Sequence, residues 1–486
     1  MYKLAMETGL GKSGYLVKEN KMNLLNVRWI RTLLSSRWFP IVPQLIMLAV
    51  FGLLIAGGLG VKTPDPSFAK VLRNTNLANL LVWSYWWPLV IVAAILLGRA
   101  WCMVCPMELV TSLAGRIGLR RKVLHLFKSG WVITIFYTLI VIVGIHGLSL
   151  HRIPHRMALY LLMLLSVAVV VGLIYEKRAF CSYVCPVGHL LGLYALVSPL
   201  EWRADNLSLC KSCKTKDCVV KKNHYRIVGR SCTSNLYPAT IKDNQDCLLC
   251  TQCLKACPNN NLRWSTRWPF ADFFHAIELR AAQVGFVLLV SGFIVYEILS
   301  EWPVSKAILT WVPRHFVGSL GITGPIADSL SAVIMFIVFP CVLLLAVLAL
   351  AKLRSAVPYG AIAKTLALLL LPTMASAHLL KAILKMTSRI PYWPHIFSDP
   401  TGIVTAHKIL DGRLALDKSV LNALYPIISF VAAALFLTAL LSTLFIFRKA
   451  TAIRNLDSGA KVPLLLGVLV YWSIFGFMIF MWRFYF

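Results

Sequence analysis

The chain has 486 residues, of which 58% are apolar and 14% are charged, and Lys and Arg exceed Asp and Glu by a formal net charge of +30. This composition excludes an ordinary soluble domain and predicts a membrane protein. The basic residues are spread over many loops and do not gather on one face, which argues against a nucleic-acid partner.

Nine apolar runs reach about 20 residues, the length that crosses a hydrocarbon core of about 30 Å. They predict transmembrane helices at 41–61, 78–98, 130–149, 157–175, 283–300, 329–351, 362–384, 424–446 and 463–482. Lys and Arg are frequent before the first run and after the second, and scarcer in the alternate loops. The positive-inside rule therefore predicts a cytoplasmic N-terminus, an external C-terminus and a cytoplasmic position for the polar stretch 177–280.

Two similar phrases follow the second and fourth runs: "GRAWCMVCPMELV" at 98–110 and "EKRAFCSYVCPVGHLL" at 176–191. Each contains a cysteine pair followed by proline, and the first pair is one residue closer together. Residues three or four apart share a helix face, so the two thiols of a pair can point the same way. The pairs together offer four thiolates, the number that an iron–sulfur cluster needs, from Cys102, Cys105, Cys181 and Cys185.

Other interpretations of these pairs stay open. They are also compatible with redox dithiols, with a zinc site, or with small buried residues at helix ends. Arg99 and Arg178 precede the pairs. Each arginine either offsets thiolate charge or anchors its span at the lipid headgroups, and we favour the anchoring role.

A second group of cysteines lies between the fourth and fifth runs. The stretch "CLLCTQCLKACP" has the spacing C-x2-C-x2-C-x3-C-P, in which the last cysteine ligates the neighbouring [4Fe–4S] cluster. The preceding stretch, "CKSCKTKDC" and then Cys232, is spaced more loosely, and zinc or no metal is its alternative. Crossed ligation predicts one cluster held by Cys210, Cys213, Cys218 and Cys257 and another held by Cys232, Cys247, Cys250 and Cys253.

The order of these features resembles the membrane polyferredoxins of the NapH, NosR and CcoG type. The resemblance rests on the tryptophan-rich span "VWSYWWPLVIVAAILLGRAWC", the two cysteine pairs and the cysteine-rich stretch, over roughly residues 25–265. It implies electron transfer in respiration or in metalloenzyme maturation. The first pair departs from the usual C-x3-C-P spacing, no stretch resembles the flavin domain of the NosR-like members, and the spans after about 280 lie outside the resemblance.

Few ionisable residues lie inside the later spans. His378, Lys381 and Lys385 share one side of the seventh span. An ionisable residue inside a span is a functional hypothesis, so His378 is a candidate for a quinone, proton or haem role. A haem needs a second axial histidine, and His146 is the residue available at similar depth. Both lysines can instead extend to the membrane surface.

The sequence as a whole predicts an all-α polytopic protein of the bacterial inner membrane, with an inserted cytoplasmic two-cluster ferredoxin-like domain. The expected parts are an N-terminal segment (1–40), a four-helix membrane domain (41–200), the ferredoxin-like domain (201–270) and a membrane domain of about five helices (271–486).

The predicted function is single-electron transfer between a cytoplasmic or quinol donor and a respiratory or maturation partner. The expected partners are membrane lipid and either a soluble electron carrier or a membrane subunit. A copper reductase for metalloenzyme assembly, and a redox-sensing transporter or scaffold, are the alternatives.

Overall fold

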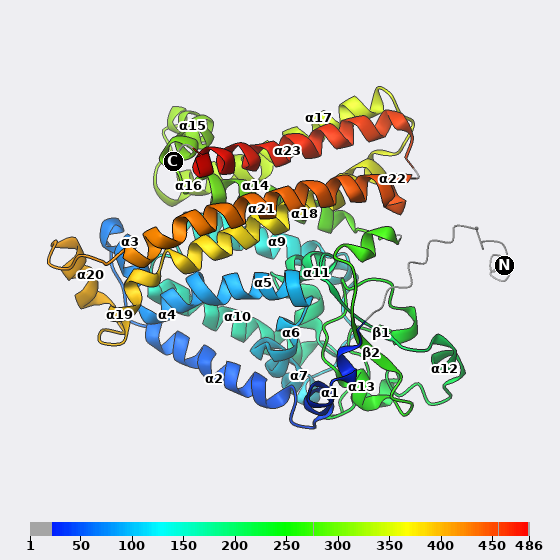
Figure 1. Cartoon of the computed structure of the whole chain (residues 1–486). Helices are drawn as coiled ribbons and strands as arrows, with labels where there is room; N and C mark the ends of the chain where they lie inside the picture. The colour runs from blue at the N-terminus through cyan, green and yellow to red at the C-terminus, as the bar shows by residue number, and fades with distance from the viewer. Residues whose placement is uncertain (1–21, 276, 455, 485–486) are drawn as a thin grey trace.

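The computed structural model describes residues 22–275, 277–454 and 456–484, so residues 1–21 of the predicted N-terminal segment lie outside the described residues. In the described part, eight helices are long and apolar enough to cross a membrane, and the third predicted span is present as a shorter apolar helix, Trp131–Gly147. The prediction of an all-α polytopic fold is confirmed (Figure 1).

The first membrane half contains four of these helices, and two of them include wider π-helical turns, η2 and η3. Its membrane elements are α2 (Ile41–Gly58), α4 (Leu77–Leu80), η2 (Leu81–Trp86), α5 (Trp87–Leu97), α9 (Trp131–Leu139), η3 (Ile140–Gly147) and α10 (Pro154–Ile174). Shorter elements connect them: η1 (Leu24–Asn26), α1 (Arg28–Ser35), α3 (Pro66–Thr75), α6 (Trp101–Val104), α7 (Pro106–Ile117), α8 (His125–Lys128), η4 (Phe180–Val184) and α11 (Gly188–Ala195).

The second membrane half contains five apolar helices. Its membrane elements are α14 (Ala281–Leu299), α16 (Gly324–Val333), η8 (Ile334–Val338), α17 (Phe339–Lys352), α18 (Tyr359–Thr387), η9 (Ile390–Tyr392), α19 (Trp393–Ile396), α21 (Ser419–Lys449) and α23 (Ser458–Phe484). Three further helices lie between them: α15 (Pro303–Ser319), α20 (Ile403–Leu410) and α22 (Thr451–Arg454).

Helix α18 joins the two halves. It packs against α5 of the first half and against α14, α21 and α23 of the second. Most of its side chains are buried, including a nearly continuous run from Thr365 to Ala377. A helix whose side chains are buried on most sides lies in the centre of a bundle, and α18 takes that place.

The residues 201–270, which we name the cysteine segment, lie at one end of the bundle (Figure 1). Strands β1 (Leu200–Ala204) and β2 (Leu262–Thr266) pair antiparallel, with Trp202 opposite Trp264. They bring the two ends of the segment together. The remaining elements are short: α12 (Leu207–Ser212), η5 (Lys221–Asn223), η6 (Pro238–Thr240), α13 (Gln252–Ala256) and, just after the segment, η7 (Ala271–Phe274).

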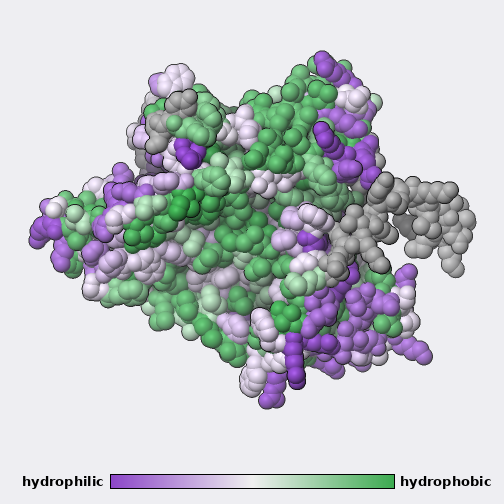
Figure 2. Space-filling view, in the orientation of Figure 1, coloured by the Kyte–Doolittle hydropathy of each residue, from purple (hydrophilic) through white to green (hydrophobic). Residues whose placement is uncertain are grey.

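Figure 2 shows an apolar band across the bundle, with polar surface over the cysteine segment and at the opposite end. This opposite end, which we name the far end, includes α3, α15, α19 and α20 (Figure 1). A band of apolar surface between two polar ends is the distribution that a bilayer requires.

Candidate metal centres

The first cysteine pair lies in a sharp turn after α5. That helix ends at Gly98, whose φ of 68° is a conformation that glycine adopts without strain. Cys102 lies in α6, a single α-helical turn, and Cys105 follows it with an extended backbone (φ −65°, ψ 127°). The residue before a proline avoids the helical conformation, so the turn stops at Cys105 and Pro106 begins α7.

The second pair repeats this arrangement with one more residue. Cys181 is the second residue of the π-helical turn η4, as Cys102 is of α6, and Cys185 follows the turn with an extended backbone (φ −51°, ψ 117°). The Cys185 amide donates to the Phe180 carbonyl, five residues back, at 2.7 Å. A π turn spans one more residue than an α turn. The longer spacing of the second pair is therefore absorbed within the turn.

The structure brings the two pairs together. Burial raises the pKa of Cys105 well above its ordinary value, and the neighbouring charges of Cys181, Cys102 and Cys185 raise it further. Burial also raises the pKa of Cys181, and it raises that of Cys185 to about 11. The neighbouring thiol charges in these shifts place the four cysteines of the two pairs close to one another.

The four cysteines predicted to hold the first cluster line one small cavity: Cys210, Cys213, Cys218 and Cys257. Asn261 contacts two of these thiols. Its backbone amide donates to the Cys257 Sγ at 3.4 Å, and its side-chain amide donates to the Cys210 Sγ at 3.3 Å. Burial, and after it the three neighbouring thiols, raise the pKa of Cys218 to about 11.

The cysteines predicted to hold the second cluster also lie together. Burial raises the pKa of Cys253, and Cys250, Cys247 and Cys232 add to the effect. The indole Nε1 of Trp202 donates to the Cys253 Sγ at 3.3 Å. Cys253 lies in α13 and Cys257 caps the same helix, so one short helix connects the first group of thiols with the second.

Arg178 lies between the cysteines predicted to hold the second cluster and the two cysteine pairs, since both Cys250 and Cys181 act on its charge. Its side chain is 2% exposed. Burial lowers the pKa of Arg178, but Glu108, Cys250 and Cys181 outweigh burial and raise it. The Arg178 Nε donates to the Glu108 Oε1 at 2.6 Å. The interpretation of Arg178 as a lipid anchor is therefore wrong, because the side chain is buried among protein groups.

Arg99 has a similar environment at the first pair. It is 7% exposed, and its Nη1 donates to the Gln245 carbonyl at 3.0 Å. Burial lowers the pKa of Arg99, but the charge of Cys102 raises it. The lipid-anchor interpretation is wrong for Arg99 as well, and the alternative, that it offsets thiolate charge, agrees with these contacts.

The sequence analysis did not single out Glu108 as a functional residue, although it is a charged residue in an apolar stretch. It is 2% exposed and accepts hydrogen bonds from Arg178, from Arg230 at 2.5 Å and from Gln44. Burial alone raises the pKa of Glu108, but Arg178 and Arg230 outweigh burial and hold the pKa at about 2. The carboxylate thus stays charged and fixes both arginines beside the cysteine groups.

Within the described residues, no group of three or more His, Cys, Asp or Glu side chains is arranged for a single metal ion. A zinc ion draws four thiolates into one tight tetrahedron, whereas a cubane cluster holds its four thiolates further apart, one on each iron. The three groups of four thiols offer the donor set of a [4Fe–4S] cluster.

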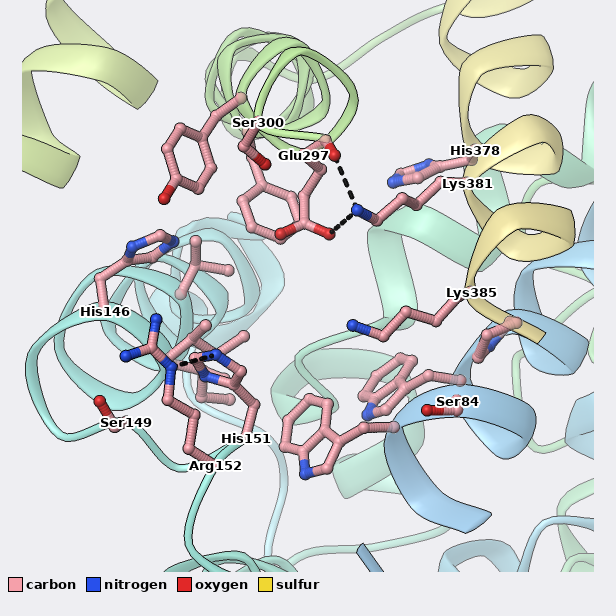
Figure 3. A pocket seen from close by; sticks show the side chains of 18 of the residues that line it. Ser84, His146, Ser149, His151, Arg152, Glu297, Ser300, His378, Lys381 and Lys385 are labelled. Atoms are coloured by element: carbon pink, nitrogen blue, oxygen red, sulfur yellow. Dashed lines mark hydrogen bonds and ion pairs between the residues drawn. The ribbon is translucent and has the colours of Figure 1, made fainter. Parts of the chain in front are cut away.

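A cavity of about 600 Å³ lies between the two membrane halves (Figure 3). Pro186 and Val187, which directly follow Cys185, form part of its lining. His378 and His146 both line it. His378 Nδ1 is hydrogen-bonded to the Tyr194 hydroxyl, whereas His146 packs against aromatic rings. The cavity is large enough for a small organic ligand, and a quinone or haem role of His378 stays a prediction.

Lys381 also faces this cavity. Its Nζ lies 3.3 Å from the Glu297 Oε2 and also contacts Glu301 (Figure 3). The Lys381 side chain is therefore held between Glu297 and the more exposed Glu301 at the end of α14.

Two stretches of the chain, residues 79–125 and 157–204, match the family model described as a 4Fe-4S binding domain. The first stretch contains Cys102 and Cys105, and the second contains Cys181 and Cys185. An uncharacterized protein of Methanocaldococcus jannaschii is 29% identical over 184 residues, which are 36% of this chain and 68% of that protein. No solved structure matches the chain.

Proposed function

We propose that this membrane iron–sulfur protein transfers single electrons between a soluble partner at the cysteine segment and a partner at the membrane cavity. The observation that carries the proposal is the arrangement of three groups of four thiols in series. Iron–sulfur clusters supply one-electron redox chemistry when bound to such thiolates.

The series begins in the cysteine segment and ends at the cavity. Cys210, Cys213, Cys218 and Cys257 form the first group and Cys232, Cys247, Cys250 and Cys253 form the second, and α13 connects them. Arg178 lies between the second group and the third, and the third consists of Cys102, Cys105, Cys181 and Cys185. The residues after Cys185 line the cavity. We therefore propose that the third group holds a cluster in addition to the two of the cysteine segment.

Residues around the thiols support this role. Trp202 and Asn261 donate hydrogen bonds to cysteine sulfurs, and such bonds set the reduction potential of a bound cluster. Arg178 and Arg99 place positive charge beside buried thiolates.

The number of clusters can be measured as iron and acid-labile sulfide per chain, on protein purified without oxygen. About 12 irons are expected for three four-iron clusters, and about 8 for the Cys181→Ala variant. The matched control is Cys341→Ala, because Cys341 lies in α17 outside all three groups. About 8 irons in the wild-type protein contradict the third cluster, and zinc in place of iron contradicts the whole proposal.

The function can be tested with the protein in lipid vesicles. A reduced low-potential dye is added on the side of the cysteine segment, and absorbance and electron paramagnetic resonance follow reduction of the clusters. Reoxidation by a quinone analogue supports electron transfer at the membrane. Reoxidation by Cu(II) alone favours the copper reductase. Clusters that respond to neither acceptor favour the redox-sensing scaffold.

A further inference from the structure

The membrane cavity extends toward the far end of the bundle, and its lining carries an excess of positive charge. Seven basic and three acidic side chains line the cavity: Arg73, Arg152, Lys306, Arg314, Lys381, Lys385 and Arg389, with Glu297, Glu301 and Asp328. Lys381 takes Glu297 and Glu301 as its partners. Among the described residues, Lys381 is the cation of this lining that forms an ion pair with a carboxylate.

Four of these cations form a cluster, although they come from separate parts of the chain. Arg73 belongs to α3, Arg152 to the loop before α10, Lys385 to α18, and Arg389 follows α18. Burial lowers the pKa of Arg73 to about 10, and the charges of Arg389 and Arg152 contribute to this shift. Figure 3 shows Lys385 extending into the cavity toward the side from which His151 and Arg152 project. Like charges held this close repel one another unless an anion lies between them.

His151 adds a hydrogen-bond donor to the cluster. The Arg152 Nε donates to the His151 Nε2 at 3.3 Å. Burial and the charges of Arg73, Arg152 and Lys385 hold the pKa of His151 well below its ordinary value, so the ring is neutral at physiological pH. Because the Nε2 accepts, the proton of the neutral ring is on Nδ1, and this buried Nδ1 has no partner in the described residues.

Two further buried groups of the lining that can only donate lack a partner among the described residues: the Trp83 Nε1 and the Arg389 Nε. Neither atom can accept a hydrogen bond, and the same is true of the Lys385 ammonium. These unpartnered donors favour a ligand that presents acceptors, because a buried donor without a partner costs about 1–3 kcal/mol.

We propose that the far end of this cavity binds an anionic group with several acceptor oxygens, a phosphate or a carboxylate. Arg73, Arg152, Lys385 and Arg389 supply the charge, and His151 and Trp83 supply neutral donors. This inference does not rest on the proposed electron transfer, since it concerns charges and donors that are independent of the cysteines.

The anion has two possible sources with the same chemistry. One is a small anion from water, and the other is the headgroup of an anionic phospholipid. Helix α15 borders the cavity through Lys306 and Arg314, while its Val304 and Ile308 are more than 70% exposed. Such an amphipathic helix fits the membrane surface, where both sources are present.

The test uses the whole protein in nanodiscs of neutral phosphatidylcholine. Melting is followed while inorganic phosphate is added at constant ionic strength, and in parallel discs that contain phosphatidylglycerol. A ligand that binds the folded state alone raises the melting temperature in proportion to its occupancy. Stabilisation by phosphate identifies a free anion, and stabilisation by phosphatidylglycerol alone identifies the lipid headgroup.

The decisive variant is Lys385→Gln, and Lys364→Gln is its matched control, because Lys364 is an exposed residue of the same helix. Lys385→Gln removes one of several mutually repelling charges, so we expect it to fold. The apparent affinity for the anion should fall about tenfold or more. Arg152→Gln is the second variant and should have the same effect. The proposal is overturned if neither anion stabilises the wild-type protein, or if both variants keep wild-type affinity.

Discussion

Arg178 and Glu108 form a buried ion pair that joins the two copies of the repeated cysteine phrase. The Arg178 Nη2 lies 2.5 Å from the Glu108 Oε1, and both side chains are at most 3% exposed. Glu108 follows the first cysteine pair by three residues, and Arg178 precedes the second pair by three residues. The contact therefore fixes the two pairs relative to each other.

Loss of this carboxylate should destabilise the protein. Glu108→Gln leaves the buried Arg178 and Arg230 without a counter-charge, and breaking such a pair costs about 3–5 kcal/mol. We expect a lower melting temperature in detergent and a loss of iron from the purified protein. Glu278→Gln is the control, because Glu278 is exposed. A variant that melts as the wild type does would show that the pair contributes nothing to stability.

Stability should fall as the pH drops below about 6.5 because of His189. Burial, with Arg280 and Arg99, lowers the pKa of His189 from 6.5 to about 4. The unfolded chain then binds more protons than the folded chain between these values, so acidification favours unfolding by about 1.4 kcal/mol per pH unit. The stability that the neutral ring contributes is fully present above about pH 6.5.

The pH dependence of stability should be compared with that of His189→Gln. This variant has no titrating ring and retains an atom to hydrogen-bond the Thr134 hydroxyl. Melting of both proteins between pH 7.5 and about 5.5 should show a steeper decline for the wild type. Parallel declines would mean that His189 is protonated in the folded protein at these pH values.

The local sequence predicted much of this architecture. The apolar runs gave the positions of the spans because length and hydropathy are local properties. The spacing of the cysteine segment predicted two groups of thiols, and the structure brings the same residues together. The one-residue difference between the two cysteine pairs was visible in the spacing, but the spacing alone did not show that a π turn at Cys181 absorbs the extra residue.

Apart from the cysteine groups, contacts between distant residues were not predicted. Glu108 and Arg178 are 70 residues apart, and their pairing depends on how α7 packs against α10. The cations of the cavity come from four segments, and each one alone resembles a residue at a helix end. Arg152 lies in a short loop with few charged residues, and its place beside Arg73 and Lys385 follows only from the fold.

The hydrogen bond from Trp202 to Cys253 should raise the reduction potential of the cluster that the second group of thiols holds. The Trp202 Nε1 donates to the Cys253 Sγ, and a donor stabilises the more negative, reduced form of a cluster. Trp202→Phe should lower that potential by about 40 mV, the equivalent of about 1 kcal/mol for one electron. Its control is Trp264→Phe, because Trp264 pairs with Trp202 across the sheet and its Nε1 has no partner among the described residues.

Redox titration monitored by electron paramagnetic resonance measures this difference. The two variants lose similar aromatic area, so a shift in Trp202→Phe alone assigns the effect to the hydrogen bond. An equal shift in both variants would assign it to packing of the sheet.

The cysteine segment and the far end should lie on opposite sides of the membrane, with the cysteine segment in the cytoplasm. We expect Arg413→Cys, at an exposed position after α20, to react with a membrane-impermeant maleimide in intact cells. Lys216→Cys, in the cysteine segment, should react only after the membrane is made permeable. The wild-type protein supplies the background from the native cysteines.

The reverse pattern of labelling would place the cysteine segment outside. That result would contradict the bias of Lys and Arg toward the loops at this end. It would also require an external electron partner, because the first group of thiols would then face away from the cytoplasm. Labelling of both positions in intact cells would contradict the predicted number of spans between them.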